Sequence, residues 1–548
     1  YYDMLDTDLA AGLIARCVID AISRAKKMSR CCMMVASILE DEVRFHQLAV
    51  TDRGLWRELY KRTREFGGYQ TKRRHIVHAM NKCGHGFQPW HKNDKLAVGI
   101  VALDLMEKST GLIEIRTRTT MFRQRRTEVL ATDEPMRWLQ ACHARSEILT
   151  PIYMPNFDVP RPWRNPMDGG FKSASLHKRA LIKTNDTKYI HDIMEHPMPE
   201  VYESVNACQA TGFTPNLWVT EVMRHFWEHD IAAGGLPLKH DRIPPARPDD
   251  IDTNAEARQS WRRSAAAVHD HNAQTRAERL ALAKVLHLSD KYAGKAMYYT
   301  QQLDWRGRIY PTAYHLHCQG PDFVKALLLF HQGDPLSTED SVQWFKVHGA
   351  TCFGMSKHSF EERVAWVHEM EGMILGIAEN PYLHQQWQDA DEPWQFLAWC
   401  REYWRWKLEG DTYISRLPIP QDATQSGVQI MSLLLRDEVG AKATNCTPSS
   451  RPQDLYGAVA DAVVALLEQR PDEPEATMWL EMGIDRKTTK RIVMTRPYSS
   501  TLYSGLRYVR EWAKDNGGLP VENDFTACYY LAKVIWEAMD GVMGGTQR

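Results

Sequence analysis

The chain has 548 residues, of which 43% are hydrophobic and 25% charged, as expected for a globular protein with several subdomains. Its formal net charge of −1 excludes a strongly basic protein, so any phosphate-binding surface must be local. No apolar run approaches the roughly 18 residues of a membrane-spanning helix. The 11 cysteines show no CxxC pair and no Cys/His zinc spacing, so we expect a reduced intracellular setting without a zinc site.

Most of the chain shows the apolar spacing of helices. In the N-terminal part this spacing covers 8–29, 56–82, 98–108 and 135–146, while 113–118 with 127–131 predict a small hairpin. Pro- and Gly-rich stretches interrupt the pattern at 151–166 and 234–248. The second of these leads into a long, charged, Ala-rich helical pattern at 254–292. We therefore expect a mostly helical chain with small β elements.

A short block in the middle of the chain combines an acid, a tryptophan and two arginines. Its residues are consecutive: Asp304, Trp305, Arg306, Gly307 and Arg308. Arginines on both sides of a glycine can approach a nucleic-acid backbone closely, and the tryptophan can stack on a base. The same residues also suit a structural corner held by a salt bridge, and the sequence leaves both interpretations open.

Asp422 lies between a short apolar stretch at 417–419 and a run of small polar residues. A carboxylate in such a place suits magnesium held against the phosphates of a substrate. The alternative is an ordinary turn or N-cap aspartate, because the sequence Asp-Ala-Thr-Gln-Ser-Gly suits that role too. The apolar residues 429–435 that follow predict a buried helix.

Four residues further along are spaced four apart: Arg486, Lys490, Met494 and Tyr498. Four residues advance an α-helix by about 400°, so these side chains form one stripe with steps of about 6 Å. Two cations followed by a methionine and a tyrosine suit a nucleoside triphosphate, with charge for the phosphates and a flat edge for the nucleoside. A basic, solvated helix face is the alternative.

In this order, the three segments resemble the single-subunit DNA-directed RNA polymerases of phages, mitochondria and chloroplasts. The block at 304–308 resembles the Asp-Trp-Arg-Gly-Arg block of that family, Asp422 occupies the place of its first catalytic aspartate, and the helix around 484–498 resembles its nucleotide-binding finger helix. Weaker similarity, closest to the phage branch, runs almost end to end. The resemblance implies a mostly α fold with a small β palm (α+β) in a right-hand polymerase architecture. Its expected parts are an incomplete N-terminal domain at 1–208, thumb and linker at 209–294, palm at 295–438, and incomplete fingers at 439–548.

The resemblance also implies template-dependent transfer of ribonucleotides to an RNA 3′-hydroxyl by two-metal catalysis. It implies a Mg²⁺ held by Asp422 and the carbonyl of Ala423. The implied partners are double-stranded promoter or template DNA, nascent RNA and ribonucleoside triphosphates, with no membrane and a monomeric state. The implied location is the cytoplasm of a phage-infected bacterium, with a mitochondrion left open. The implied site residues are Asp422, Lys490 and Tyr498 for catalysis; Arg486, Lys490, Arg491, Met494 and Tyr498 for the nucleotide; and Asp304, Trp305, Arg306, Arg308 and Lys325 for nucleic acid.

The family's second catalytic aspartate lies in a His-Asp-Ser block well after the finger helix, and no such block follows Tyr498 here. We therefore expect a fragment truncated at both ends and inactive by itself. The alternatives are a catalytically inactive nucleic-acid-binding remnant and a DNA polymerase resembling bacterial polymerase I. Such DNA polymerases place a glutamate soon after the first aspartate to exclude ribose, whereas 423–427 holds mostly small residues, which favours ribonucleotides.

The sequence departs from the family pattern at four positions near the expected site. Ala423 replaces a glycine, Ile430 a histidine, and Ser499 the glycine that follows the tyrosine. Pro497 precedes the tyrosine, and proline removes a helical hydrogen bond and clashes with the carbonyl of Val493. We therefore expect the helix to bend or end there, and the segment that carries Tyr498 to be stiffer without the glycine.

Overall fold

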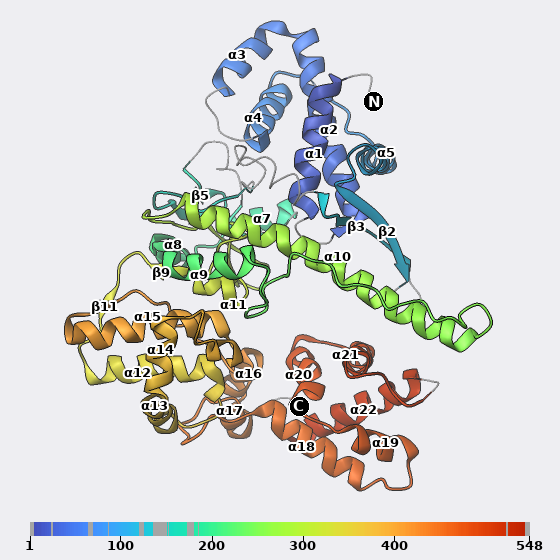
Figure 1. Cartoon of the computed structure of the whole chain (residues 1–548). Helices are drawn as coiled ribbons and strands as arrows, with labels where there is room; N and C mark the ends of the chain where they lie inside the picture. Colours follow the sequence, from blue (N-terminus) through green and yellow to red (C-terminus); the bar gives the residue numbers. More distant parts are fainter. Residues whose placement is uncertain are drawn as a thin grey trace. The chain divides into compact units, whose positions relative to one another are not determined.

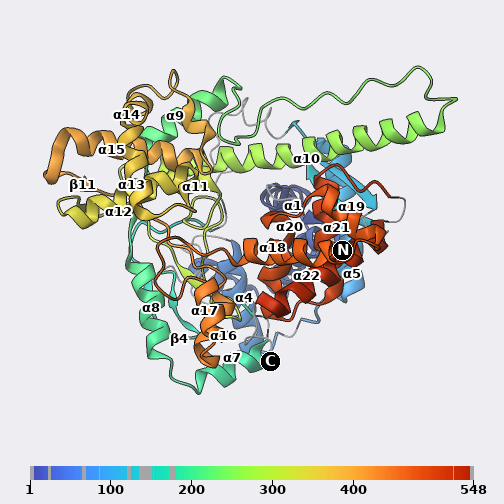
Figure 2. The same cartoon turned by 90° about the horizontal axis from the view of Figure 1, so that it is seen from below.

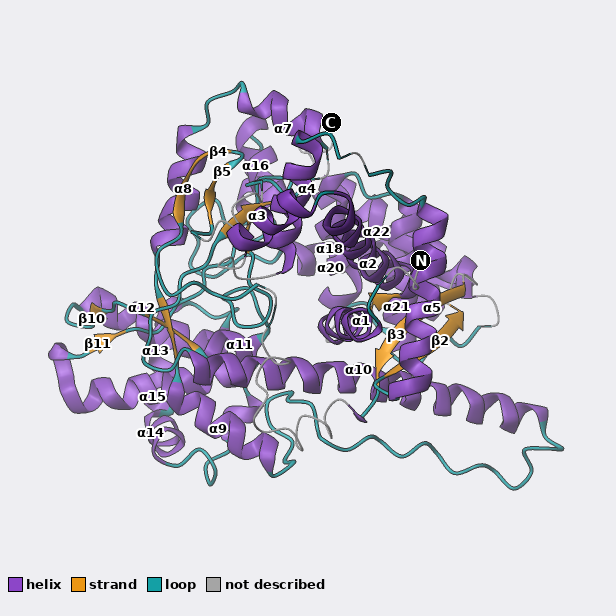
Figure 3. Ribbon diagram, turned by 90° about the horizontal axis from the view of Figure 1, so that it is seen from above, coloured by secondary structure: helices purple, strands orange, loops and turns teal. Residues whose placement is uncertain are grey.

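The computed structural model describes residues 5–542 apart from 23–25, 64–68, 86, 120–124, 135–150, 152, 173–179, 185 and 522–523. Helices dominate these residues, and the strands are short (Figure 3). The chain divides into two compact units: unit 1 holds 1–342 and 371–418, and unit 2 holds 343–370 and 419–548. In the described part, no helix combines the length and apolar character needed to cross a membrane. The mostly α prediction is confirmed.

Unit 1 begins with a helical cluster on a small sheet (Figure 1). Strand β3 lies between β1 and β2, and both pairings are antiparallel. The predicted hairpin is therefore confirmed. A Cβ on Gly99 would lie 2.4 Å from the Cα of Cys32, so the close crossing of α2 and α5 requires a glycine. The elements are α1 (Thr7–Ile22), β1 (Lys26–Lys27), α2 (Met28–Thr51), α3 (Arg53–Thr63), α4 (Tyr69–Lys82), α5 (Lys92–Thr110), β2 (Ile113–Thr119) and β3 (Arg125–Ala131).

Two helical predictions in this part need correction. The helix predicted at 8–29 ends at Ile22, because Lys26 and Lys27 pair with Val129 and Glu128 of β3. The pattern at 56–82 divides into α3 and α4, and the pattern at 98–108 is confirmed inside α5. The helix predicted at 135–146 lies outside the described residues.

The rest of unit 1 contains small two-stranded sheets among helices, and its longest element is the predicted charged helix, α10 (Ala255–Lys291), drawn in green in Figure 1. Asn254 caps α10 by accepting hydrogen bonds from the backbone of Glu256 and Ala257, each at 3.1 Å. The other elements are β4 (Arg161–Asn165), β5 (Asp168–Gly170), α7 (Thr187–Met194), α8 (Pro199–Ala210), β6 (Phe213–Pro215), α9 (Leu217–Glu228), β7 (Gln301–Leu303), β8 (Ile309–Pro311), α11 (Asp322–Ala326), β9 (Leu328–Phe330), β10 (Asp334–Pro335), α14 (Glu371–Glu379), α15 (Pro393–Glu409) and β11 (Ile414–Ser415).

Unit 2 is built on a helical core to which α18, α19, α20, α21 and α22 contribute (Figure 2). Its fully buried side chains include Trp479 of α19, Ile492 and Val493 of α20, and Leu531 of α22. The chain passes from unit 1 into unit 2 along α12 (Glu339–Ala350). The other elements of unit 2 are a π-helical turn (Thr351–Met355), α13 (Phe360–Glu369), α16 (Ser426–Leu435), α17 (Glu438–Ala443), α18 (Leu455–Glu468), α19 (Pro474–Met482), α20 (Arg486–Thr495), α21 (Leu502–Asp515) and α22 (Asp524–Val542).

The helix predicted at 429–435 is confirmed as part of α16, but its predicted burial is wrong. Ile430, Leu433, Leu434 and Leu435 are all more than half exposed, and only Gly427, Val428 and Ser432 of this helix are buried. Apolar content alone misled the prediction, because burial depends on which faces of a helix have neighbours.

Candidate functional site

The stripe of cations lies on α20, which begins at Arg486. Asp485 caps this helix: its carboxylate accepts a hydrogen bond from the backbone of Thr488 at 2.9 Å, and the Thr488 hydroxyl donates back to it at 2.8 Å. Ile492 and Val493, on the buried side of α20, pack into the core of unit 2. One face of α20 is therefore fixed by packing, and the face that carries the stripe is turned away from the core.

The helix ends where the sequence predicts it. The last residue of α20 is Thr495, and Arg496–Tyr498 form a single 3-10 turn around Pro497. Ser499 follows in the left-handed region, with a φ of +63°. A serine thus adopts the conformation for which glycine is usually used.

Arg486 is held by an acid that the sequence analysis did not single out. Its Nε donates to both carboxylate oxygens of Asp454, at 2.8 and 3.2 Å. The Nζ of Lys357 lies 3.2 Å from Oδ2 of the same carboxylate. Burial by itself raises the pKa of Asp454, but these two cations outweigh it and lower that pKa below its ordinary value. Asp454 therefore gathers two cations from separate parts of unit 2.

The ring of Tyr456 lies under the first half of the stripe. Cζ of Arg486 lies 5.0 Å from its centroid, and Nζ of Lys490 lies 5.9 Å from it. The hydroxyl of Thr489 donates to the Tyr456 carbonyl at 2.9 Å, which joins α20 to the start of α18. Burial raises the pKa of the Tyr456 phenol, and the charge of Asp422 raises it further. The Asp422 carboxylate therefore lies close enough to act electrostatically on Tyr456, the ring over which Arg486 and Lys490 lie.

Asp422 itself lies on an exposed loop just before α16. Gln425 ends this loop with a φ of +55°, and its Nε2 donates to the carbonyl of Val493 at 2.7 Å. On the other side, Asn445 donates to the hydroxyl of Thr424 at 2.9 Å. The loop that carries the expected metal ligand is therefore tied to the helix that carries the cations.

The far end of the stripe lies beside the start of α16. A Cβ on Gly427 would lie 3.0 Å from Cζ and Oη of Tyr498, so the tyrosine ring packs directly on this glycine. Tyr498 and Met494 are 52% and 42% exposed, so both side chains are partly open to solvent. Arg491 has other neighbours: it pairs with Glu511 and lies over the Tyr508 ring at 4.6 Å, and its role toward a nucleotide stays a prediction.

The arginine block lies in unit 1, at the turn between β7 and β8. The Asp304 carboxylate accepts hydrogen bonds from the backbone of Arg306 at 2.9 Å and of Arg308 at 3.1 Å, and from the Arg306 guanidinium at 2.7 Å. Desolvation raises the pKa of Asp304, but these bonds lower it on balance. The structural corner that the sequence left open is therefore present, while Trp305 is 74% exposed and available for contact. Lys325 lies on α11 and is partly buried.

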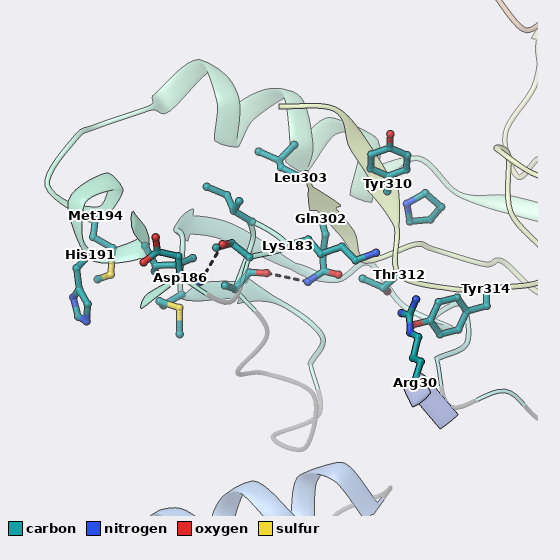
Figure 4. Close-up of a pocket in the computed structure, with 16 residues that line it drawn as sticks. Arg30, Lys183, Asp186, His191, Met194, Gln302, Leu303, Tyr310, Thr312 and Tyr314 are labelled. Carbon is teal, nitrogen blue, oxygen red and sulfur yellow. Dashed lines mark hydrogen bonds between the residues drawn. The ribbon is translucent and has the colours of Figure 1, made fainter. Parts of the chain in front are cut away.

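Unit 1 also contains a cavity of about 820 Å³ beside β7 and β8 (Figure 4). Lys183, Gln302, Thr312, Tyr314 and Arg30 lie along one part of it, and Asp186, His191 and Met194 along another. None of the site residues named by the sequence analysis lines this cavity.

The region that carries the cation stripe matches a known family. Residues 335–548 match the sequence model of the DNA-dependent RNA polymerases. The DNA-directed RNA polymerase of Enterobacteria phage K11 is 33% identical over 501 residues, which are 83% of this chain and 54% of the phage protein. T7 RNA polymerase of Escherichia phage T7 is 31% identical, over 83% of this chain and 55% of its own length. The chain is a homologue of the single-subunit DNA-directed RNA polymerases.

A mitochondrial DNA-directed RNA polymerase, from Schizosaccharomyces pombe, is 28% identical over 71% of this chain and 34% of its own length. The chain spans about half the length of the phage relatives it matches. The region that matches the family model holds Asp422 and the whole stripe. It also holds Lys357, Asp454 and Tyr456, which sequence reasoning missed. Those three have no helical spacing to the stripe, and tertiary contacts alone bring them to it.

Proposed function

We propose that this chain supplies the nucleotide-binding part of a DNA-directed RNA polymerase, which transfers ribonucleotides to an RNA 3′-hydroxyl under the direction of a DNA template. The observation that carries the proposal is the convergence of Arg486, Lys490, Tyr498 and Asp422 around Tyr456 in a homologue of these polymerases. Partners of the whole protein would be template DNA, nascent RNA and ribonucleoside triphosphates. The division into N-terminal domain, thumb, palm and fingers is part of the same proposal.

Each side chain of the stripe has its own role toward the nucleotide. Arg486 binds the terminal phosphate, and Lys490 neutralises charge nearer the scissile bond and is placed to protonate the leaving group. In the described part of the chain, no carboxylate forms an ion pair with Lys490, so its charge is available to a substrate. Tyr498 and Met494 contact the nucleoside. Trp305 and Arg308 contact the nucleic acid.

The oxygen atoms available near the stripe are of a type that suits magnesium. Asp422 has an exposed carboxylate, and the neighbouring carbonyl of Ala423 is a second hard oxygen of the type that Mg²⁺ prefers. The described residues hold no group of three or more His, Cys, Asp or Glu side chains able to bind a metal. The remaining ligands would be substrate phosphates, water and a further carboxylate. When bound, the metal supplies charge stabilisation and activation of the attacking hydroxyl.

The experiment is RNA extension on a template–primer scaffold by the product of the complete gene, with Lys490→Ala compared with Lys487→Ala. Lys487 is an exposed cation of the same helix, about 60° around the helix axis from Lys490, so its loss removes the same charge from a neighbouring direction. We expect Lys490→Ala to lose roughly 100-fold or more in extension rate, on the scale of one lost preorganised donor, and Lys487→Ala to stay near wild type. Equal rates for the two variants contradict the assignment, and faster extension with deoxynucleotides favours a DNA polymerase.

A further inference from the structure

Asp454 contacts only one edge of the Arg486 guanidinium. Both carboxylate oxygens accept from Nε, at 2.8 and 3.2 Å, and the structure contains no hydrogen bond from either Nη to a described residue. The Cζ atom of the guanidinium lies over the Tyr456 ring, 5.0 Å from its centroid. The group is thus held at its Nε edge and lies against an aromatic ring, and the edge formed by Nη1 and Nη2 is left available.

A guanidinium is planar, and its paired N–H groups match two phosphate oxygens only when the plane is correctly turned. An arginine side chain otherwise loses considerable rotamer entropy when it is fixed by a ligand. A carboxylate that accepts hydrogen bonds from Nε fixes the guanidinium plane before a ligand binds. This arrangement lowers the entropy cost of bidentate phosphate binding.

The position of Asp454 is otherwise unfavourable for an anion site. It places one negative charge among the cations Arg486, Lys357 and Lys490, where it lowers the attraction for any phosphate. Simple electrostatics therefore predicts that removal of this charge strengthens phosphate binding. Orientation of the guanidinium predicts the opposite.

We propose that Asp454 is a positioning residue, which orients the Nη edge of Arg486 toward the terminal phosphates of a nucleoside triphosphate. The proposal rests on the proposed function, because it needs Arg486 to meet those phosphates. Asp454 lies at the N-cap position of α18, directly before Leu455. Lys357 bonds the same carboxylate and adds a second restraint.

The test is isothermal titration of this chain with inorganic tripolyphosphate, ATP and AMP. Asp454→Asn keeps the shape of the side chain, and asparagine is a favoured residue at the N-cap position that Asp454 occupies. The fold should therefore persist, and circular dichroism checks it. Asp461→Asn is the matched control, because it removes the same charge from an exposed position about two turns along α18. We expect Asp454→Asn to lower the affinity for tripolyphosphate and ATP about tenfold, the scale of one charged hydrogen bond. The affinity for AMP should not change. Asp461→Asn should bind all three ligands like wild type or slightly more tightly.

A second background isolates the orientation effect. In Arg486→Lys there is no guanidinium plane to orient, so adding Asp454→Asn should cause no further weakening of tripolyphosphate binding. Equal or tighter binding by Asp454→Asn alone overturns the positioning role while leaving the nucleotide site intact. Full weakening by Asp454→Asn in the Arg486→Lys background also overturns it. Absence of tripolyphosphate binding by the wild-type chain overturns the nucleotide site itself, and with it the positioning role.

Discussion

The side-chain amide of Gln425 donates a hydrogen bond to the backbone carbonyl of Val493 at 2.7 Å. In a continuous helix this carbonyl would accept from the backbone of residue 497, but Pro497 has no N–H. The amide from the Asp422 loop therefore replaces the hydrogen bond that the proline removes. One contact satisfies a helix end and joins the expected metal ligand to the expected nucleotide helix.

Removal of the Gln425 amide should lower the free energy of unfolding most when Pro497 is present. We expect Gln425→Leu to lower the free energy of unfolding by about 1–3 kcal/mol, because it leaves a buried carbonyl without a donor. In a Pro497→Ala background the new N–H can bond Val493, so the same change should cost clearly less. Urea unfolding of the four chains in this double-mutant cycle measures the coupling. Strictly additive losses would contradict the compensation.

Ser499 is strained by its positive φ, and glycine should relieve it. Relief of left-handed strain is worth about 1–2 kcal/mol, and the greater freedom of unfolded glycine offsets about 0.5–1 kcal/mol of that. We expect Ser499→Gly to be neutral or stabilising by up to about 1 kcal/mol, and Ser499→Val to be destabilising because a β-branched residue rarely adopts this φ. Thermal unfolding of both variants separates the outcomes, and a more stable valine variant would be inconsistent with the observed φ.

Gly427 sets the position of the Tyr498 ring. A methyl group at residue 427 would lie 3.0 Å from the ring, so the half-exposed tyrosine must shift by a few tenths of an ångström. We expect Gly427→Ala to change stability by less than about 1 kcal/mol but to weaken ribonucleotide use severalfold. Steady-state extension by the complete gene product checks this, with Gly541→Ala of α22 as a control because its added methyl has no other atom within 4 Å. Unchanged kinetics would show that the ring position tolerates the shift.

The Asp454 cluster predicts a specific loss of stability in acid. The folded pKa of Asp454 lies below its ordinary value of 3.8, so its contribution is complete above that value and is lost as pH falls through the folded pKa. Asp454→Asn should therefore flatten part of the decline in unfolding free energy below about pH 4. Denaturant unfolding between pH 2.5 and 6 measures the slope, with Asp461→Asn as the control. Identical acid slopes for wild type and Asp454→Asn would contradict the paired carboxylate.

The side chain of Trp305 is mostly exposed, which suits a residue that stacks on a nucleic-acid base. We expect Trp305→Ala to leave stability within about 0.5 kcal/mol and to weaken binding of an RNA–DNA hybrid by about 1–3 kcal/mol, the range for one base–aromatic stack. Leu383→Ala is a suitable control, since Leu383 is also 74% exposed and lies in unit 1. Fluorescence anisotropy with a labelled hybrid distinguishes the two. Equal affinity for both variants would leave the block at 304–308 as a structural corner only.

Much of the local structure was predictable because it depends on short-range rules. The bend at Pro497, the hairpin at 113–131 and the long helix after Asn254 follow from proline chemistry, strand alternation and capping. The helix that carries the cation stripe follows from spacing alone. Burial was less predictable: the leucines of α16 are exposed although their apolar run predicts a core helix.

The resemblance to the polymerases, the mostly helical class and the stripe from Arg486 to Tyr498 can all be read from the sequence, because motif order and helical period are properties of the chain. The neighbours of that stripe depend on how the helices of unit 2 pack. Asp454 and Lys357 meet Arg486 through contacts between separate elements, and Gln425 meets Val493 across 68 positions of sequence. Such pairings depend on how helices pack in space, and side-chain packing leaves no periodic trace in the sequence.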